Sequence, residues 1–110
     1  MSSVSERITI SPATHRARQR AVQDVIQREG WSGLVVLDST DITWLTGLRS
    51  SNAAVLLTPE RVIVATDFRY VAEAEARGLE VSRIEQSMWS DLGKLAGEVA
   101  RGGLLAYPPA

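Results

Sequence analysis

The sequence predicts an α/β domain in which a mixed β-sheet of about five strands is flanked by helices. Segments with helical periodicity alternate along the chain with short runs rich in β-branched residues. Two of these runs, 53–58 and 61–66, are separated only by Pro59-Glu60, which is typical of a hairpin. With 110 residues, 45% of them hydrophobic and 23% charged, the chain suits a single globular domain with one core.

The first helix is predicted to begin at Ser11-Pro12, because a hydroxyl can cap the helix and proline suits its first position. It runs to about Glu29, where Gly30 ends it. The apolar run 33–37 then predicts a buried strand. The apolar stripe of the helix comprises Ala21, Val22, Val25 and Ile26.

The basic run 15–20 lies in this helix and contains His15, the only histidine. We interpret it as a solvated helix start, with Arg18 covering part of the apolar stripe. The net charge of -1 gives no general reason to expect nucleic acid or an anionic membrane as a partner.

The polar loop 38–52 is the candidate recognition region. Residues 38–41 can form a turn or cap, and Ile42, Trp44 and Leu45 are expected to anchor a short helical turn against the sheet. Gly47 ends that turn, and 48–52 is expected to be an exposed polar tip. Two readings stay open: a capping connection with a structural tryptophan, or a recognition surface. For the second, Arg49 offers a planar fork for carboxylates, with Trp44 and Asp38 nearby.

The second half of the chain predicts two more helix–strand pairs. Asp67 caps a helix that runs to about Arg77 and stops at Gly78, and 79–84 follows as a strand. An amphipathic helix over 87–101 precedes a last strand over 104–107. Within the first of these helices Arg69 is expected to pair with Glu73 and Tyr70 to pack; Trp31 and Trp89 are expected in core or interdomain packing.

Nothing in the sequence nominates a catalytic centre. There is no cysteine and no second histidine, so a zinc site of usual composition cannot be assembled, and no nucleophile elbow or phosphate-binding loop is present. We therefore expect no catalytic residue and no metal ligand in this chain. The N-terminus lacks a signal peptide and no apolar run approaches the roughly 18 residues that span a bilayer, so we expect a cytoplasmic protein without membrane partners.

Two motifs carry a family resemblance. The run Asp41-Ile-Thr-Trp-Leu-Thr-Gly-Leu48, followed by a hairpin and by Asp67-Phe-Arg-Tyr70, resembles the N-terminal domain of the creatinase / aminopeptidase P / prolidase superfamily. The resemblance covers essentially the whole chain and implies a ribonuclease H-like fold. Departures are Asp41 for the usual Asn, Trp44 for Tyr and Leu48 for an aromatic residue.

The resemblance also implies a function. In such proteins the domain precedes a catalytic domain that holds two divalent metal ions (Mn, Co or Zn) with two Asp, one His and two Glu. The loop after the first strand reaches across a homodimer interface and gates short proline-containing peptides. Carried over by position, the gating and interface candidates are Asp38, Trp44, Arg49 and Ser50.

The chain is predicted to be one domain, 1–110, whose polar first ten residues are expected to be flexible. Pro108-Pro109 predicts that 108–110 begin a linker, which by the resemblance leads to the catalytic domain. The leading hypothesis is the non-catalytic N-terminal domain of a Xaa-Pro peptidase. The alternatives are the same domain of a creatinase-like C–N hydrolase and a catalytically inactive protein-binding module. Metal ligands downstream would separate the first two from the third.

Overall fold

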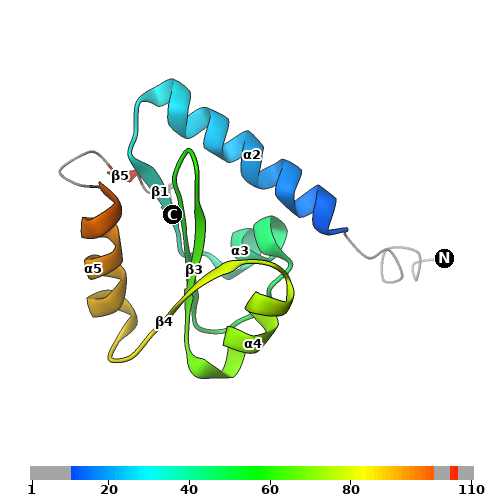
Figure 1. Cartoon of the computed structure of the whole chain (residues 1–110), viewed down its shortest axis with the longest axis vertical. Helices are drawn as coiled ribbons and strands as arrows, with labels where there is room; N and C mark the ends of the chain where they lie inside the picture. Colours follow the sequence, from blue (N-terminus) through cyan, green and yellow to red (C-terminus); the bar gives the residue numbers. More distant parts are fainter. Residues whose placement is uncertain (1–10, 101–104, 107–110) are drawn as a thin grey trace.

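Five strands form one mixed sheet in the order β4-β3-β2-β1-β5 in the computed structural model, which describes residues 11–100 and 105–106 (Figure 1). The strands are β1 (Gly33–Val36), β2 (Ala53–Leu57), β3 (Val62–Thr66), β4 (Glu80–Arg83) and β5 (Leu105–Ala106). The helices are α2 (Pro12–Glu29), α3 (Ser39–Thr46), α4 (Phe68–Ala76) and α5 (Met88–Ala100). The predicted fold class is therefore confirmed. The predicted flexible start, 1–10, and the linker, 108–110, lie outside the described residues.

The strand pairings follow from how the chain connects them. The hairpin places β2 antiparallel to β3, and β1 pairs antiparallel with the other side of β2. The outer strands β4 and β5 pair in parallel with β3 and β1. A parallel pair needs a crossover, and α4 supplies it between β3 and β4.

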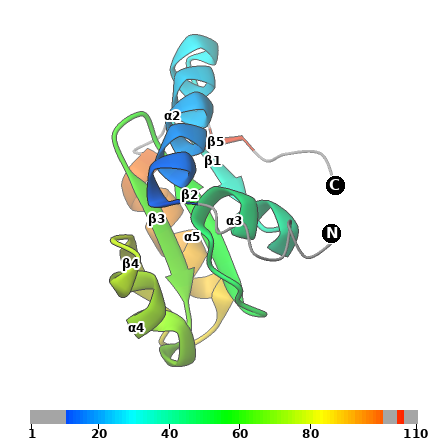
Figure 2. The same cartoon turned by 90° about the vertical axis from the view of Figure 1, so that its right-hand side faces the viewer.

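Helices cover both faces of the sheet, as Figures 1 and 2 show. One buried cluster joins α2, α3 and α4 to the first face of the sheet, and a second joins α5 to the opposite face. Along β2, Val55 and Leu57 belong to the first cluster and Ala54 and Leu56 to the second. This alternation explains why the hairpin strands are apolar at nearly every position.

The predicted apolar stripe of α2 is only half right. Ile26 is buried and Val22 is partly buried, but Ala21 and Val25 are exposed. The inward face runs instead through His15 and Gln19 in the N-terminal half of the helix, where α2 crosses the polar end of α3. Polar side chains are favoured there because they can bond the free carbonyl groups of α3.

The tryptophans differ in their burial. Trp31 packs against the first-face cluster, as predicted, whereas Trp89 is 71% exposed at the start of α5 and is no part of the core. Within the part of the chain that the structure describes, no helix combines the length and apolarity needed to cross a membrane.

Candidate functional site

The loop between β1 and β2 begins with α3, whose N-cap is the one that the sequence predicts. The Asp38 carboxylate accepts a hydrogen bond from the Asp41 backbone N–H at 3.0 Å, which is the usual N-cap geometry. At the other end, the Thr46 hydroxyl donates to the Ile42 carbonyl at 2.7 Å and accepts from the Leu48 N–H at 3.0 Å. The predicted short turn is thus a capped helix of eight residues.

Trp44 does not anchor this helix, contrary to the prediction. Ile42 and Leu45 are buried against the sheet, whereas Trp44 is 49% exposed. The cause is helical geometry, since a residue two positions after an inward-facing residue points to the other side of the helix. The Trp44 ring lies beneath the guanidinium of Arg18, 4.5 Å from its centroid, so this arginine covers a tryptophan rather than the apolar stripe of its own helix.

The segment after α3 is more buried than predicted. Gly47 adopts a left-handed conformation with φ 78°, which ends the helix and turns the chain back toward the sheet. Leu48 is fully buried and Ser50 is buried, so the prediction of an exposed polar tip is wrong for both. Arg49 between them is exposed. Its two buried neighbours fix the backbone on either side, so its side chain is presented outward from an ordered segment.

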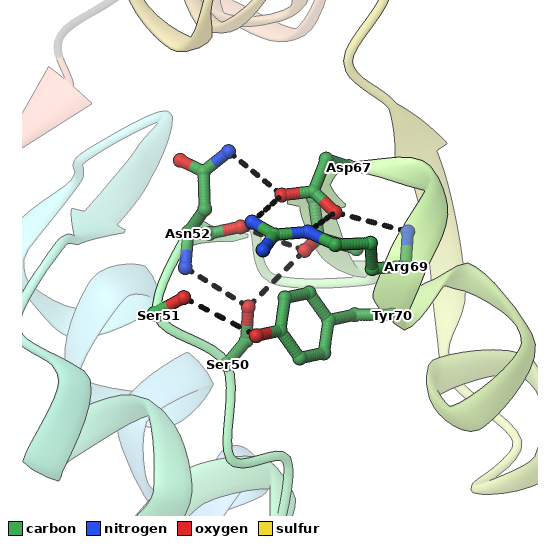
Figure 3. A network of polar contacts seen from close by, with 7 residues as sticks. Ser50, Ser51, Asn52, Asp67, Arg69 and Tyr70 are labelled. Carbon is green, nitrogen blue, oxygen red and sulfur yellow. Dashed lines mark hydrogen bonds and ion pairs between the residues drawn. The ribbon is translucent and has the colours of Figure 1, made fainter.

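A polar network fastens this segment to the end of β3 (Figure 3). The Thr66 hydroxyl donates to the Asn52 carbonyl at 2.7 Å, and the Ser50 and Thr66 hydroxyl oxygens lie 3.3 Å apart. The Ser50 hydroxyl also accepts from the Asn52 N–H at 3.1 Å. These bonds give the buried hydroxyl groups partners and hold the loop at the carboxyl end of β3.

Asp67 is the charged centre of the network. It caps α4 by accepting from the Arg69 N–H at 2.9 Å, and its two carboxylate oxygens accept from the Arg69 guanidinium at 3.1 and 2.9 Å. Its Oδ2 also accepts from the Asn52 side-chain amide at 2.9 Å. The hydrogen bonds from Arg69, and then from Asn52, hold the pKa of the Asp67 carboxyl well below its usual range.

The predicted pairing of Arg69 with Glu73 is therefore wrong. Arg69 turns back to its own helix cap, and Glu73 instead pairs with Arg77 at 3.2 Å. Arg69 pairs with Asp67 rather than with Glu73 because the Asp67 carboxylate presents both oxygens to the guanidinium, and a two-point ion pair of this kind is stronger. Arg69 also lies 5.2 Å over the ring of Tyr70, whose hydroxyl is 3.2 Å from that of Ser51.

The four candidate residues do not form one cluster of contacts. Asp38 caps the start of α3, Trp44 stacks on Arg18 near its end, and Arg49 and Ser50 follow in the loop. Among residues 11–100 and 105–106, no hydrogen bond or ion pair joins any two of the four. Only Ser50 belongs to the network in Figure 3.

Sequence reasoning missed the network partners Asn52, Thr66 and Asp67 as parts of the site. The sequence does predict Asp67 as a helix cap, and this local role gives no reason to expect a second partner in the loop. Its bond to Asn52 spans fifteen positions and leaves no periodic signal in a single sequence. Within the same described ranges, no group of three or more His, Cys, Asp and Glu side chains is placed to hold a metal ion. The arrangement can present a guanidinium on an ordered loop, which is a means of binding rather than of bond cleavage.

Comparison with known proteins agrees with this picture. The sequence profile described as "Creatinase/Prolidase N-terminal domain" matches residues 18–104 of the chain. No curated protein sequence matches the chain.

Several solved structures share the fold. The N-terminal domain of the cytoplasmic peptidase PepQ from Mycobacterium tuberculosis H37Rv is 25% identical, with a TM-score of 0.67 over 86% of this chain and 92% of that one. An aminopeptidase P from Streptococcus thermophilus is 18% identical, with a TM-score of 0.68 over 86% of this chain and 92% of that one. A Xaa-Pro dipeptidase from Bacillus anthracis is 21% identical, with a TM-score of 0.69 over 88% of this chain but only 27% of that one.

The profile match spans the capped helix α3, the loop that carries Arg49 and the network around Asp67, and the neighbours share the overall fold. This chain belongs to the creatinase/prolidase N-terminal domain family.

Proposed function

We propose that this chain is the non-catalytic N-terminal domain of a Xaa-Pro peptidase, in which the loop after α3 helps to gate the substrate. The observation that carries the proposal is the placement of Arg49. It is exposed between the buried residues Leu48 and Ser50, on a loop fastened to β3 and α4. A guanidinium held in this way can bind the carboxylate of a short peptide with little loss of loop entropy.

The partners follow from the same proposal. The catalytic work belongs to a companion domain with two divalent metal ions, and no side chain of this chain is proposed as a ligand. The protein acts as a cytoplasmic homodimer, so that the loop of one subunit closes over the active site of the other. PepQ of M. tuberculosis, described as a cytoplasmic peptidase, supports this assignment by its likeness to the chain.

The gate is tested by replacing Arg49 in the full-length protein. Arg49→Ala should lower kcat/KM for Xaa-Pro peptides about tenfold or more, because a hydrogen bond to a charged group is worth about 1.5–3 kcal/mol. Arg49→Lys should recover part of the loss, since it restores the charge without the planar fork. Steady-state kinetics with short proline-containing peptides measures both effects.

The matched control is Arg20→Ala, which removes another exposed arginine from α2. It should leave the kinetics unchanged. Equal kinetics for Arg49→Ala and the parent protein, at equal thermal stability, would remove Arg49 from the gate.

Peptide mapping of the native gene product by mass spectrometry tests the assignment to a peptidase. Peptides that continue past residue 110 into a domain with two Asp, one His and two Glu ligands in order would support it. A native polypeptide without those ligands would instead favour the protein-binding module.

A further inference from the structure

His15 is buried where α2 crosses α3. The sequence suggested a solvated basic helix start, but the His15 side chain is only 7% exposed. Its ring Nδ1 lies 3.1 Å from the Trp44 carbonyl oxygen. Among the described residues His15 makes no hydrogen bond to the Asp67 network, so this buried titratable side chain requires a role of its own.

That role begins with the free carbonyl groups of α3. The last four carbonyls of any helix lack partners within it, and in a helix of eight residues these make up half of the carbonyls. Side chains of α2 satisfy two of them from outside. The Arg18 guanidinium donates to the Trp44 carbonyl at 2.9 Å, together with His15, and the Gln19 amide donates to the Leu45 carbonyl at 3.0 Å.

The bond to Trp44 fixes the tautomer of His15. A carbonyl oxygen can only accept, so Nδ1 must carry the proton. In the neutral ring Nε2 then has a lone pair and no proton. This nitrogen faces the turn at the end of α3, where it lies 2.8 Å from the point that a Cβ on Gly47 would occupy.

Arg77, the C-cap residue of α4, reaches the same point from the end of that helix. Its Nη1 lies 2.7 Å from the Cβ position of Gly47, while its Nε is hydrogen-bonded to the Glu73 carboxylate at 3.2 Å. The turn at Gly47 is therefore enclosed by a ring nitrogen from α2 and by the guanidinium of the residue that caps the end of α4. Both side chains are held elsewhere, His15 by Trp44 and Arg77 by Glu73.

We propose that His15 and Arg77 are positioning residues that lock the turn at Gly47 and so set the direction in which 48–52 leaves α3. We call His15 and Arg77 together the lock. The lock fixes the end of 48–52 that follows α3, and the network around Asp67 fixes the end that precedes β2. Arg49 lies between the two. The effect of the lock on catalysis rests on the proposed gating function, whereas the lock itself does not.

The first test is spectroscopic and independent of activity. Because His15 is the only histidine, its ring nitrogens give a unique signal in a ¹⁵N-labelled sample. At alkaline pH, where a histidine ring is neutral, long-range ¹H–¹⁵N correlation should show the proton on Nδ1. A ring with the proton on Nε2 overturns the proposal.

The second test compares variants of the lock. His15→Leu should shift the backbone amide signals of 47–52, because the turn loses the imidazole ring, which is one of the two groups that enclose it. His15→Asn should reverse most of these shifts, since its side-chain amide nitrogen can take the place of Nδ1 and donate to the Trp44 carbonyl. Arg20→Ala, on the exposed side of the same helix, should not move these signals.

Unmoved loop signals in a folded His15→Leu protein would overturn the proposal, as would a His15→Asn protein that behaves like His15→Leu. Arg77→Gln gives an independent check if His15→Leu fails to fold. It replaces the guanidinium with a shorter, uncharged side chain that cannot reach as far, and the same loop signals should move.

In the full-length protein, His15→Leu should lower kcat/KM for Xaa-Pro peptides about ten- to hundredfold, the range expected for a small misplacement of a binding group. His15→Asn should recover most of it. If Arg49→Ala leaves the kinetics unchanged while the loop signals still move in His15→Leu, the gating function fails and the lock stands. If the loop signals stay in place while Arg49→Ala is impaired, the lock fails and the gate stands.

Discussion

Asp67 shows how one residue can serve a helix and a loop at once. Its carboxylate caps α4 through the Arg69 N–H and also binds the Asn52 side chain from the loop. An uncharged cap would satisfy the helix equally well. The charge therefore matters chiefly for the guanidinium of Arg69, which bonds both carboxylate oxygens.

Asp67→Asn tests this at the level of stability and pH. The folded pKa of Asp67 is depressed, so its stabilising effect is fully present at neutral pH and is lost as the pH falls through the ordinary value of 3.8 toward the folded one. The variant should melt at a lower temperature than the parent at pH 7. The difference should narrow below about pH 5, because the Asp67 carboxyl of the unfolded parent then takes up a proton while that of the folded parent stays ionised, which lowers the parent's free energy of unfolding.

Thermal unfolding of both proteins between pH 7 and pH 3 measures the effect. Asp24→Asn is the control, since Asp24 is an exposed carboxylate on α2 with no hydrogen bond or ion pair among the described residues. Its difference from the parent should stay small at every pH. A constant gap between Asp67→Asn and the parent would contradict the role assigned to the charge.

At the scale of elements, α3 owes its position to both of its ends. Its start is a local cap that the sequence predicts, Asp38 with Asp41. Its end depends on side chains from α2 and α4, which no local pattern indicates. The short helix is thus specified half locally and half by tertiary contacts.

Gly47→Ala should destabilise the protein more than Gly30→Ala. Both glycines adopt positive φ, 78° and 74°, so alanine is strained at either site by about 1 kcal/mol or more. At Gly30 nothing lies within 4 Å of the added methyl group, whereas at Gly47 it meets His15 and Arg77. Arg77 can swing away, but the buried ring of His15 cannot move without giving up its bond to Trp44.

Chemical denaturation of the two variants gives the comparison directly. We expect about 1–2 kcal/mol of lost stability for Gly30→Ala and a clearly larger loss for Gly47→Ala. Equal losses in the free energy of unfolding for the two variants would mean that the turn at Gly47 can accommodate a methyl group and that His15 and Arg77 do not enclose it.

At the scale of the whole molecule, the sheet separates two clusters of unequal support. The first face is covered by three helices, α2, α3 and α4, and the second by α5 among the elements that the structure describes (Figure 1). Successive side chains of β2 and β3 point to opposite faces of the sheet, so both strands contribute residues to both clusters. Because α5 covers the second cluster among the described elements, its packing helps to keep that side of the core out of water.

The sequence predicts this architecture well because caps, turn residues and β-branched runs are local signals. Ser11 and Gly30 mark both ends of α2, and Pro59-Glu60 marks the hairpin. Sequence reasoning fails where tertiary contacts override local pattern. The inward face of α2 includes the polar residue His15, because carbonyl groups of α3 lie opposite it. A search for apolar residues at helical spacing cannot identify such a polar face.

The candidate site is predicted less well for the same reason. Exposed and buried residues alternate from Leu48 to Ser51, so a run of polar letters cannot separate Arg49 from Ser50. The partners that bury Ser50 come from the end of β3, more than a dozen positions away. Only the folded chain places them together.

The packing of α5 gives the last prediction, in which the smaller side chain matters more. Leu92 is 5% exposed within the second cluster, whereas Trp89 one turn earlier is 71% exposed. Leu92→Ala should lower the free energy of unfolding by about 2–5 kcal/mol, because it leaves a cavity between α5 and the sheet. Trp89→Ala should change it by less than about 1 kcal/mol, since the ring is already in water. Urea denaturation at constant m-value measures both changes, and a loss for Trp89→Ala as large as that for Leu92→Ala would show that the tryptophan helps to cover the sheet.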